Sequence, residues 1–558
     1  MPRPKVTESF RDQMRGFPFS QILLICLVRF AEPIAFTSLF PYVYFMVKDF
    51  GIAKTEAEIA KYSGYLSSTF AFCQFLTSYN WGRFADRHGR KPTLLIGLTG
   101  SICSLLTLGF AKNYYWALAA RSIMGLLNGN VAVIRTMIGE VATERKHQAL
   151  AFSTMPLIFQ VGCVIGPMLG GYLSGKESRF AALRPLAEAF PYALPNIVVS
   201  SLLFTSMIVA IFFLEETHYK HKYRRDYFVE IGDFLKKVLF GVETKVRPWQ
   251  SRKENVDSVD EETALIDDDN ENQAQNYDGT NNDSDSSIQS VPNMISRRTS
   301  KALIRAYSLH EEGDIEEDKE SWKALLTPHI FYAVVCNFIM SLHLTVHDEF
   351  LPIFLAYDVA KDKAGNLISK FPFKIVGGLN YTSEDTGRLL SSTGMLGIFV
   401  ILVVFPYVDR HYESLPTYKR FIRIFPVTYT LTPFLVFLAD HKTASMVICY
   451  VFTCFKTLAT SISFPQILLI VHNSSPAKHR AMINGATISI SALARCAGPL
   501  IWGYIFSWAQ EYQIAWAGWW SLTVLALLAI YQSRYLRESS DEDEEENQTQ
   551  SLQNDSTE

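Results

Sequence analysis

The sequence predicts an all-α membrane protein whose twelve helices form two bundles of six. Continuous apolar runs of about 20 residues, the length that spans the hydrocarbon core of a bilayer, recur along most of the 558-residue chain. The runs do not alternate apolar with polar residues, so they predict helices and not the strands of a membrane barrel. A long polar segment in the middle of the chain separates six runs from the other six, and this division predicts the two bundles.

The expected spans fall in two stretches of the chain. The N-terminal bundle occupies residues 20–215, with spans at 20–46, 62–81, 93–112, 114–136, 148–174 and 191–214. The C-terminal bundle occupies residues 327–535, with spans at 328–356, 385–407, 420–439, 443–472, 483–508 and 513–534. The first run is too long for the apolar core of a cleavable signal peptide. We therefore expect residues 1–19 to remain as an N-terminal tail.

The segments outside the bundles are polar. Residues 216–326 are rich in Asp, Glu, Asn, Ser and Gln, and such a composition cannot bury enough apolar surface to offset the entropy of the chain. We predict a disordered loop there, with a short amphipathic helix around 226–240, and an acidic tail at 536–558. Lys and Arg gather in the loops after the second, fourth, eighth and tenth spans, which predicts that both termini and the central loop are cytosolic.

Composition also narrows the class of protein. All eight cysteines lie inside apolar runs, where a free Cys packs as a small hydrophobic residue, so no disulfide is expected. The sequence shows no Cys/His cluster spaced for a metal, no GxxxxGK(S/T) phosphate loop and no constellation of catalytic residues. We therefore expect no enzyme, no cofactor or metal site, and no nucleic acid as a partner.

The loop after the second span carries Gly82-Arg-Phe-Ala-Asp86-Arg87-His-Gly89-Arg90-Lys91. Its glycines permit a tight turn, and Asp86 can lie against the positive N-terminus of a neighbouring helix. The arginines can pair with an acid such as Glu140. A basic anchor at the cytosolic surface is the alternative, but it explains neither Asp86 nor the glycine spacing.

This loop resembles the GxxxD(R/K)xGR(R/K) signature of the major facilitator superfamily. The resemblance implies a twelve-helix major facilitator fold with two pseudo-symmetric six-helix bundles. It also implies a conformational latch, a set of charged contacts that favours one state of a transporter. The predicted latch residues are Gly82, Asp86, Arg87, Gly89, Arg90, Lys91 and Glu140.

The fifth span carries a second motif, formed by Gly162, Gly166, Pro167, Gly170 and Gly171. Small residues let helices approach closely, and a proline kinks a helix by removing one backbone hydrogen bond. The spacing resembles the GxxxGPxxGG motif of the drug:proton antiporter branch, which implies exchange of a substrate for protons. Generic helix packing is the alternative.

The second half of the sequence echoes the first, as a duplicated fold predicts. Asp409-Arg410 follows the eighth span, and Gly498-Pro499 lies in the eleventh. Within the superfamily, the stretches Phe40–Met46, Tyr381–Gly387 and Arg480–Pro499 are similar to zinc-induced-facilitator-like members of fungi and plants. The Cys-Pro-Gly-Cys motif of the plant members is absent, so no zinc-related substrate is inferred.

Charged residues inside the spans are costly and therefore mark candidate proton or substrate positions. Arg29 and Glu32 lie three residues apart on one helix face and form either a structural ion pair or a proton-binding site. Arg121 either couples protons or forms a fixed ion pair. In the seventh span, the acids either cap an exposed helix end or line the transport route. Lys456 either pairs with one of them or binds an anionic substrate. The full set is Arg29, Glu32, Arg121, His347, Asp348, Glu349, Lys456 and Arg495.

The polar segments also carry possible signals. Glu261, Leu265 and Ile266 fit an acidic dileucine pattern, which would engage adaptor complexes and favours a vacuolar or other intracellular membrane over the plasma membrane. Ser300, Ser539 and Ser540 fit kinase sites, and Asn380 begins a glycosylation sequon. The alternative for all of them is an unmodified loop.

Together these features predict a secondary active transporter. We expect proton-coupled antiport of a small organic molecule or ion by alternating access, in which two bundles rock about a central site. A proton-independent facilitator is the first alternative, and a transport-inactive membrane receptor or scaffold is the second. The sequence does not identify the substrate.

Overall fold

The computed structural model describes residues 16–142, 145–175, 183–218, 221–241, 328–363, 365–474 and 480–536. The predicted sorting residues Glu261, Leu265 and Ile266 and the predicted phosphorylation sites Ser300, Ser539 and Ser540 lie outside these residues.

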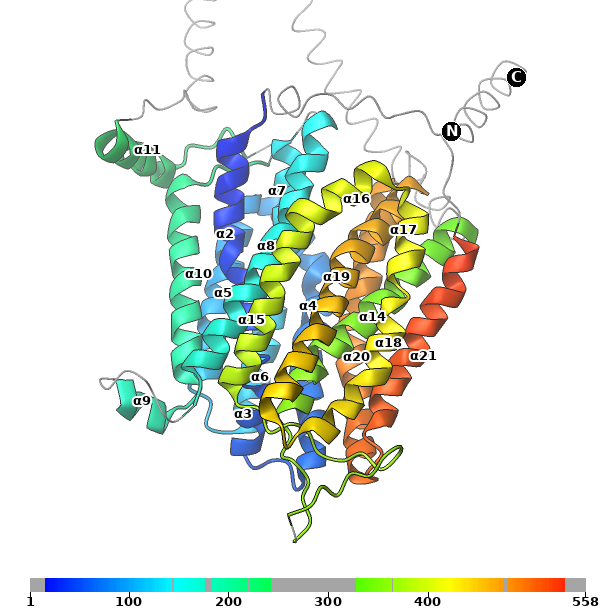
Figure 1. Ribbon diagram of the computed structural model, residues 1–558. Coiled ribbons are helices and arrows are strands. Elements are labelled where there is room, and N and C mark those ends of the chain that lie inside the picture. The colour runs from blue at the N-terminus through cyan, green and yellow to red at the C-terminus, as the bar shows by residue number, and fades with distance from the viewer. Residues whose placement is uncertain are drawn as a thin grey trace, which may run out of the picture.

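Helices make up most of the described chain (Figure 1). The first half contains α2 (Phe19–Thr37), α3 (Val43–Asp49), α4 (Glu56–His88), α5 (Arg90–Gly109), α6 (Tyr114–Leu126), α7 (Asn130–Val141), α8 (Arg145–Leu173), α9 (Arg184–Ala189), α10 (Ala193–Phe213) and α11 (Tyr227–Phe240). The second half contains α14 (Pro328–Ala356), α15 (Ser383–Phe399), a π-helical turn (Val400–Val404), α16 (Phe405–His411), α17 (Ser414–Phe421), α18 (Ile424–Leu431), a 3₁₀ segment (Thr432–Leu438), α19 (Lys442–Asn473), α20 (Arg480–Glu511), α21 (Trp516–Gln532) and a final 3₁₀ turn (Ser533–Tyr535).

Every expected span coincides with a helix or with helices joined by a short break. The first span is divided between α2 and α3, and the fourth is divided between α6 and α7 at Leu127–Gly129. Among the described residues, nine helical segments are long and apolar enough to cross a membrane. Helices α4, α20 and α21 fall outside that group, so the number of twelve crossings stays a prediction.

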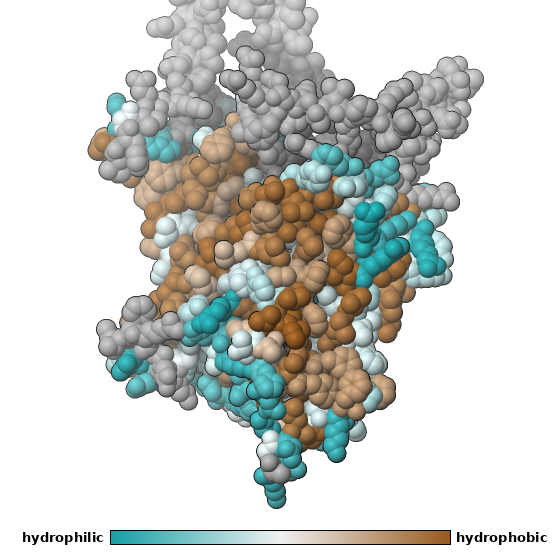
Figure 2. Space-filling view, viewed as in Figure 1, coloured by the Kyte–Doolittle hydropathy of each residue, from teal (hydrophilic) through white to brown (hydrophobic). Residues whose placement is uncertain are grey.

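The long helices run side by side between two ends of the molecule (Figure 1). The start of α2, the helix α11 and the end of α21 lie at one end, which we call the α11 end; α3 and α9 lie at the other, the α9 end. Apolar side chains cover much of the visible face between these ends, and hydrophilic ones gather mainly near them (Figure 2). Exposed Met395, Phe399, Val447 and Phe455 belong to this apolar surface, as expected for contact with lipid.

The buried apolar side chains form two large clusters. One lies within the first half and includes Ile25, Leu98 and Met137. The other fills the second half but also takes in residues of the first half near the α9 end, among them Tyr44 and Ile59. The hydrophobic core is therefore continuous between the halves toward the α9 end.

Two pseudo-equivalent helix contacts join the halves. In one, the Pro167 carbonyl of α8 faces Gly387 of α15, where an added Cβ would lie 2.5 Å from that oxygen. In the other, the Pro499 carbonyl of α20 faces Gly64 of α4, where the distance would be 2.3 Å. Residues at matching offsets also pair across the halves: Arg388 donates to Tyr172 (3.4 Å), and the hydroxyls of Tyr65 and Tyr504 hydrogen-bond. The proline elements predicted as internal echoes thus occupy corresponding places in a duplicated architecture.

Candidate functional site

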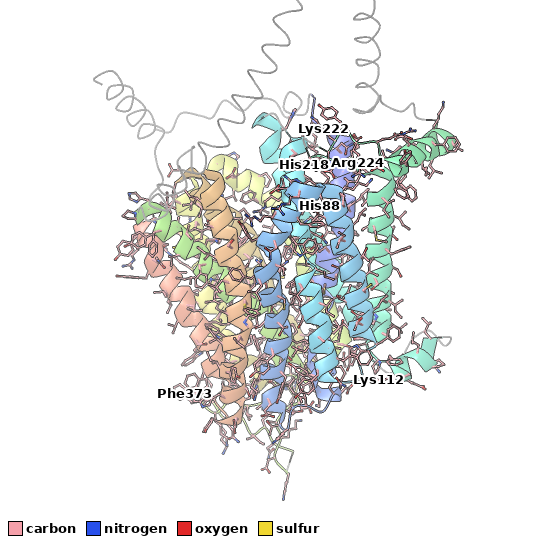
Figure 3. All side chains as sticks on the ribbon, turned by 180° about the vertical axis from the view of Figure 1, so that it is seen from behind. His88, Lys112, His218, Lys222, Arg224 and Phe373 are labelled. Carbon is pink, nitrogen blue, oxygen red and sulfur yellow. The ribbon has the colours of Figure 1, made fainter. Side chains whose placement is uncertain are left out.

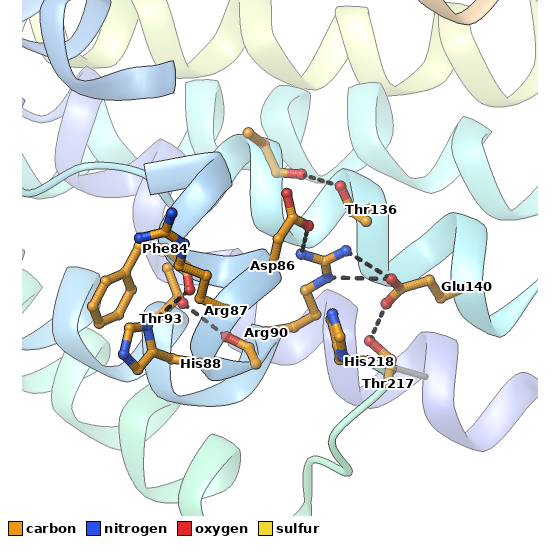
Figure 4. A network of polar contacts seen from close by, with 12 residues as sticks. Phe84, Asp86, Arg87, His88, Arg90, Thr93, Thr136, Glu140, Thr217 and His218 are labelled. Atoms are coloured by element: carbon orange, nitrogen blue, oxygen red, sulfur yellow. Dashed lines mark hydrogen bonds and ion pairs between the residues drawn. The ribbon is translucent and has the colours of Figure 1, made fainter. Parts of the chain in front are cut away.

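The turn between α4 and α5 holds a charged network (Figure 4). Arg90, at the first position of α5, donates to Asp86 (2.5 Å) in the last turn of α4. Through Nε and Nη2 it also donates to Glu140 of α7 (3.1 and 3.0 Å). Thr217 donates to the other oxygen of Glu140 (2.5 Å). The predicted partnership with Glu140 is therefore present, and it ties α4, α5, α7 and the segment after α10 together.

Two details of this turn differ from the sequence prediction. The backbone turns at Gly89 alone (φ +107°), whereas Gly82 lies inside α4 with nothing within 4 Å of an added Cβ. Asp86 does not bond the N-terminal amides of α5; Glu216 accepts from the N–H groups of Arg90 and Lys91 (2.9 and 3.1 Å). An added Cβ on Gly89 would lie 2.4 Å from the Glu216 carboxylate. Gly89 is therefore required both for its conformation and for access of this capping acid.

The remaining motif cations lie near the α11 end. Lys91 donates to Asp226 (2.6 Å) and to the Ile211 carbonyl (2.8 Å). Asp226 is also the N-cap of α11, where it accepts from Phe228 and Val229. Lys91 thus anchors the amphipathic helix that the sequence predicts around 226–240. The backbone carbonyl of Arg87 lies 3.0 Å from Nε2 of His221. Nearby His88, His218, Lys222 and Arg224 also lie at this end (Figure 3).

The glycine motif of α8 lets this helix touch two others. Added Cβ atoms on Gly162, Gly166 and Gly170 would lie within 2.3 Å of α2 or the residues just after it: 2.3 Å from Pro33, 2.0 Å from Thr37 and 1.9 Å from the Ser38 carbonyl. On another face, Gly171 packs against α15, and its Cβ would lie 2.5 Å from the Ser383 carbonyl. The motif therefore combines close packing inside the first half with close packing between the halves.

Arg29 and Glu32 form an ion pair of 3.0 Å inside α2, and both residues are buried. Their remaining buried atoms, Arg29 Nε and Glu32 Oε1, have no hydrogen-bond partner within the described chain. The predicted contact between Arg29 and Glu32 is therefore present. Because one atom of each side chain has no partner, the pair fits both a structural ion pair and a proton-binding site.

A second charged group lies in the second half. Lys456 of α19 pairs with Asp348 of α14, which also contacts His347 Nδ1 at 3.2 Å. The alternative that the acids cap a helix end is wrong, because α14 continues to Ala356, well beyond Glu349, and Glu349 is buried. The Asp348–Lys456 pair lies close enough to Cys163, within the α8 motif of the other half, to interact with it electrostatically.

Glu349 and Arg121 face each other from opposite halves. Glu349 is 6% exposed and Arg121 is 2% exposed, and each feels the charge of the other. Arg121 stacks on the Phe70 ring (4.7 Å), and the hydroxyl of Ser67 reaches Glu349; both of these neighbours lie on α4. Glu349 Oε2 has no hydrogen-bond partner in the described residues. A buried carboxyl with its cation on the opposite half is sensitive to any movement between the halves.

At the α9 end, a surface triad also links the halves. Lys48 contacts Glu56 (2.8 Å) and Asp358 of the second half (3.0 Å). Burial and a hydrogen bond to Asp358 raise the pKa of Glu56 above its ordinary value of 4.5, and Lys48 opposes this shift. Burial acts to raise the pKa of Asp358, but hydrogen bonds with Glu56 and Lys48 outweigh it and lower that pKa. The two carboxyl groups therefore respond to different ranges of pH.

Comparison with known proteins decides the family. The sequence profile of the Major Facilitator Superfamily matches residues 25–499, which span both halves and both motifs. The chain belongs to the major facilitator superfamily. The resemblance seen in the sequence motifs is therefore confirmed.

Relatives and solved structures within the superfamily agree with this result. The chain is 32% identical, over 95% of its length and 85% of the relative's, to the major facilitator superfamily multidrug transporter mfsB of Aspergillus fumigatus. It is 24% identical to the protein ZINC INDUCED FACILITATOR 1 of Arabidopsis thaliana, over 90% of this chain and 87% of that one. Its fold is similar to that of a D-xylose–proton symporter (TM-score 0.57, 12% identity, 94% and 99% covered). It is also similar to that of the human organic anion transporter MFSD10 (TM-score 0.52, 15% identity, 92% and 99% covered).

Two residues of this major facilitator protein were not among the site residues predicted from the sequence. Glu216 follows the sixth span, and only the structure shows that its carboxylate reaches back to α5. Arg135 is a cation inside the expected fourth span, so the search for charges in apolar runs would have found it. The predicted glycosylation residue Asn380, by contrast, was identified in the sequence, and it is exposed near the α9 end, three residues before α15.

Proposed function

We propose that this chain is a proton-coupled antiporter that moves a small organic molecule by alternating access. The observation that carries the proposal is the pair of buried charges that face each other from opposite halves, Arg121 and Glu349. A buried carboxyl binds or releases a proton according to the balance between its burial and a nearby cation. When the halves separate, Arg121 moves relative to Glu349, so the balance changes with the conformation.

The second charged group supports the same mechanism. Asp348 follows His347 and precedes Glu349 on α14, and its partner Lys456 comes from α19. The glycine motif passes close to this pair at Cys163. Movement of α8 against α14 and α19 would therefore change the environment of Asp348 and Lys456. The same movement would open or close the path of a substrate. The Arg90 network would act as the predicted latch at the α11 end.

The orientation and membrane address are also proposals. The basic loops and the predicted sorting segment favour the α11 end on the cytosolic side of a vacuolar or other intracellular membrane. The Aspergillus relative, whose name includes multidrug transporter, supports a small organic molecule as the substrate. A proton gradient across such a membrane would supply the driving force.

The test is transport in proteoliposomes that contain the purified full chain. A pH gradient is imposed, and uptake is measured for a panel of anionic, neutral and cationic small molecules. The proposal predicts gradient-driven accumulation of at least one class, with proton movement that depends on that substrate. Accumulation that ignores the gradient would favour a facilitator, and absence of transport across the whole panel would contradict the proposal.

A further inference from the structure

Three arginines from three helices gather between the halves. Arg29 lies on α2, Arg135 on α7 and Arg495 on α20, so two come from the first half and one from the second. Arg135 is close enough to Arg29 to feel its charge, and Arg495 is close enough to feel that of Arg135. Helices α2 and α7 are in contact, and α4 packs against both α7 and α20. These three arginines, which we call the arginine cluster, therefore interact electrostatically one after another across the boundary between the halves.

The cluster has an excess of positive charge. Arg29 pairs with Glu32. Arg135 and Arg495 make no hydrogen bond or ion pair with any part of the chain that the structure describes. Arg135 is nevertheless exposed, and Arg495 is partly exposed, although both belong to expected membrane spans. Two guanidinium groups without a carboxylate at this depth are costly, and such charges in a membrane protein mark the path of a charged ligand.

The packing between the halves explains why these side chains are accessible. The pairs that hydrogen-bond across the halves include Lys48–Asp358, Tyr65–Tyr504 and Arg388–Tyr172. Each contains a residue at or near the α9 end of its helix, where the hydrophobic core is also continuous. Arg135, by contrast, lies in the second turn of α7, and Glu140, in the last turn of the same helix, belongs to the Arg90 network near the α11 end. Arg135 therefore lies on the α11-end side of these contacts, although one further contact between the halves, from Gln160 to the Gly394 carbonyl (3.4 Å), lies midway along α8.

Resting on the proposed function, we infer that Arg135 and Arg495 bind the anionic group of the transported molecule, which is a carboxylate-bearing organic anion. A guanidinium presents parallel N–H donors that match the two oxygens of a carboxylate. Because Arg135 and Arg495 belong to different halves, one anion can contact both halves in this conformation. Release would follow when the halves rock and the two arginines separate. Arg29 and Lys456, by contrast, already pair with Glu32 and Asp348 and are not needed for this role.

The test measures binding separately from transport. Carboxyfluorescein, a fluorescent carboxylate, is titrated with the purified full chain in detergent, and its anisotropy reports binding. Saturable binding is expected, with competition by succinate. Arg135→Gln and Arg495→Gln should each weaken binding by about tenfold or more, because a hydrogen bond to a charged group is lost. Arg495→Lys should recover part of the affinity. The matched control Lys112→Gln removes an exposed cation at the α9 end and should bind as the wild type does (Figure 3).

Several outcomes would overturn the inference. Among them are absence of carboxyfluorescein binding, equal binding by wild type and both glutamine variants, or tighter binding of the cationic dye rhodamine 123. Competition by inorganic phosphate but not by succinate would replace the carboxylate with a phosphate and contradict the stated ligand. A monodisperse elution profile for each variant separates loss of the site from loss of the fold. Arginine-dependent binding without proton-coupled uptake in proteoliposomes would refute the antiporter and leave the anion site standing.

Discussion

Replacing Gly171 with alanine should shift the protein away from the conformation described here. An added Cβ would lie 2.5 Å from the Ser383 carbonyl, and this separation would have to lengthen by about 0.9 Å to reach the 3.4 Å of ordinary contact. Because the two residues belong to different halves, opening the α9 end relieves the clash. Overpacking typically costs about 1–3 kcal/mol, which corresponds to a shift of about 5- to 150-fold in the conformational equilibrium.

Two other glycines supply graded controls. At the pseudo-equivalent Gly503, an added Cβ would lie 3.2 Å from the Ala60 carbonyl, so Gly503→Ala should shift the equilibrium less. Gly170→Ala would clash with Ser38 of its own half at 1.9 Å. That variant should lower thermal stability without favouring either conformation.

The assay is a distance measurement across the α9 end. Spin labels at Lys112→Cys and Glu511→Cys, both exposed positions, report on the two halves after removal of native cysteines. Gly171→Ala should increase the population with long distances well above that of wild type. An unchanged distance distribution in a stably folded Gly171→Ala protein, or the same increase in Gly170→Ala, would show that the Gly171–Ser383 contact does not hold the α9 end closed.

Two further changes test the charged networks. Arg90→Lys should lower the thermal unfolding temperature in detergent, because a single ammonium cannot reproduce the two bonds to Glu140; stability equal to wild type would show that these bonds contribute little. Lowering the pH from neutral toward 4.5 should stabilise the closed α9 end, because the raised pKa of Glu56 means that this conformation favours its protonated form. Asp358 opposes the effect only as the pH approaches its ordinary value of 3.8. Since these side chains are largely exposed, the shift should be less than about fivefold. It should be absent in Glu56→Gln when the same spin-label distances are measured, and a wild-type pH response in that variant would exclude Glu56 as its source.

The sequence predicted the fold better than it predicted the site. Long apolar runs must become helices in lipid, because no water is available to pair their backbone groups. The sequence also predicted that Pro167 and Pro499 are internal echoes. It did not predict that each faces a glycine of the other half, since the partners Gly387 and Gly64 are far away along the chain.

Contacts between site residues could be predicted where the two residues are close in sequence on one helix. Arg29 and Glu32 pair because they are three residues apart on a helix. The Lys456–Asp348 pair was one of several combinations that the sequence left open, because nothing in it fixes how α19 packs on α14. Glu216 could not be predicted for the same reason, because the sequence does not show that the segment after α10 folds back onto the start of α5. Asp86 is the acid closest in sequence to that helix start, but Glu216 caps it.

The most direct test of proton-coupled alternating access is proton flux in Glu349→Gln. Wild-type and variant proteins are reconstituted with a pH dye inside the vesicles, and the transported panel member is added under an imposed pH gradient. We expect that wild type moves protons when substrate moves, while Glu349→Gln still exchanges substrate for substrate but no longer responds to the gradient. A gradient response equal to that of wild type in Glu349→Gln would contradict the account.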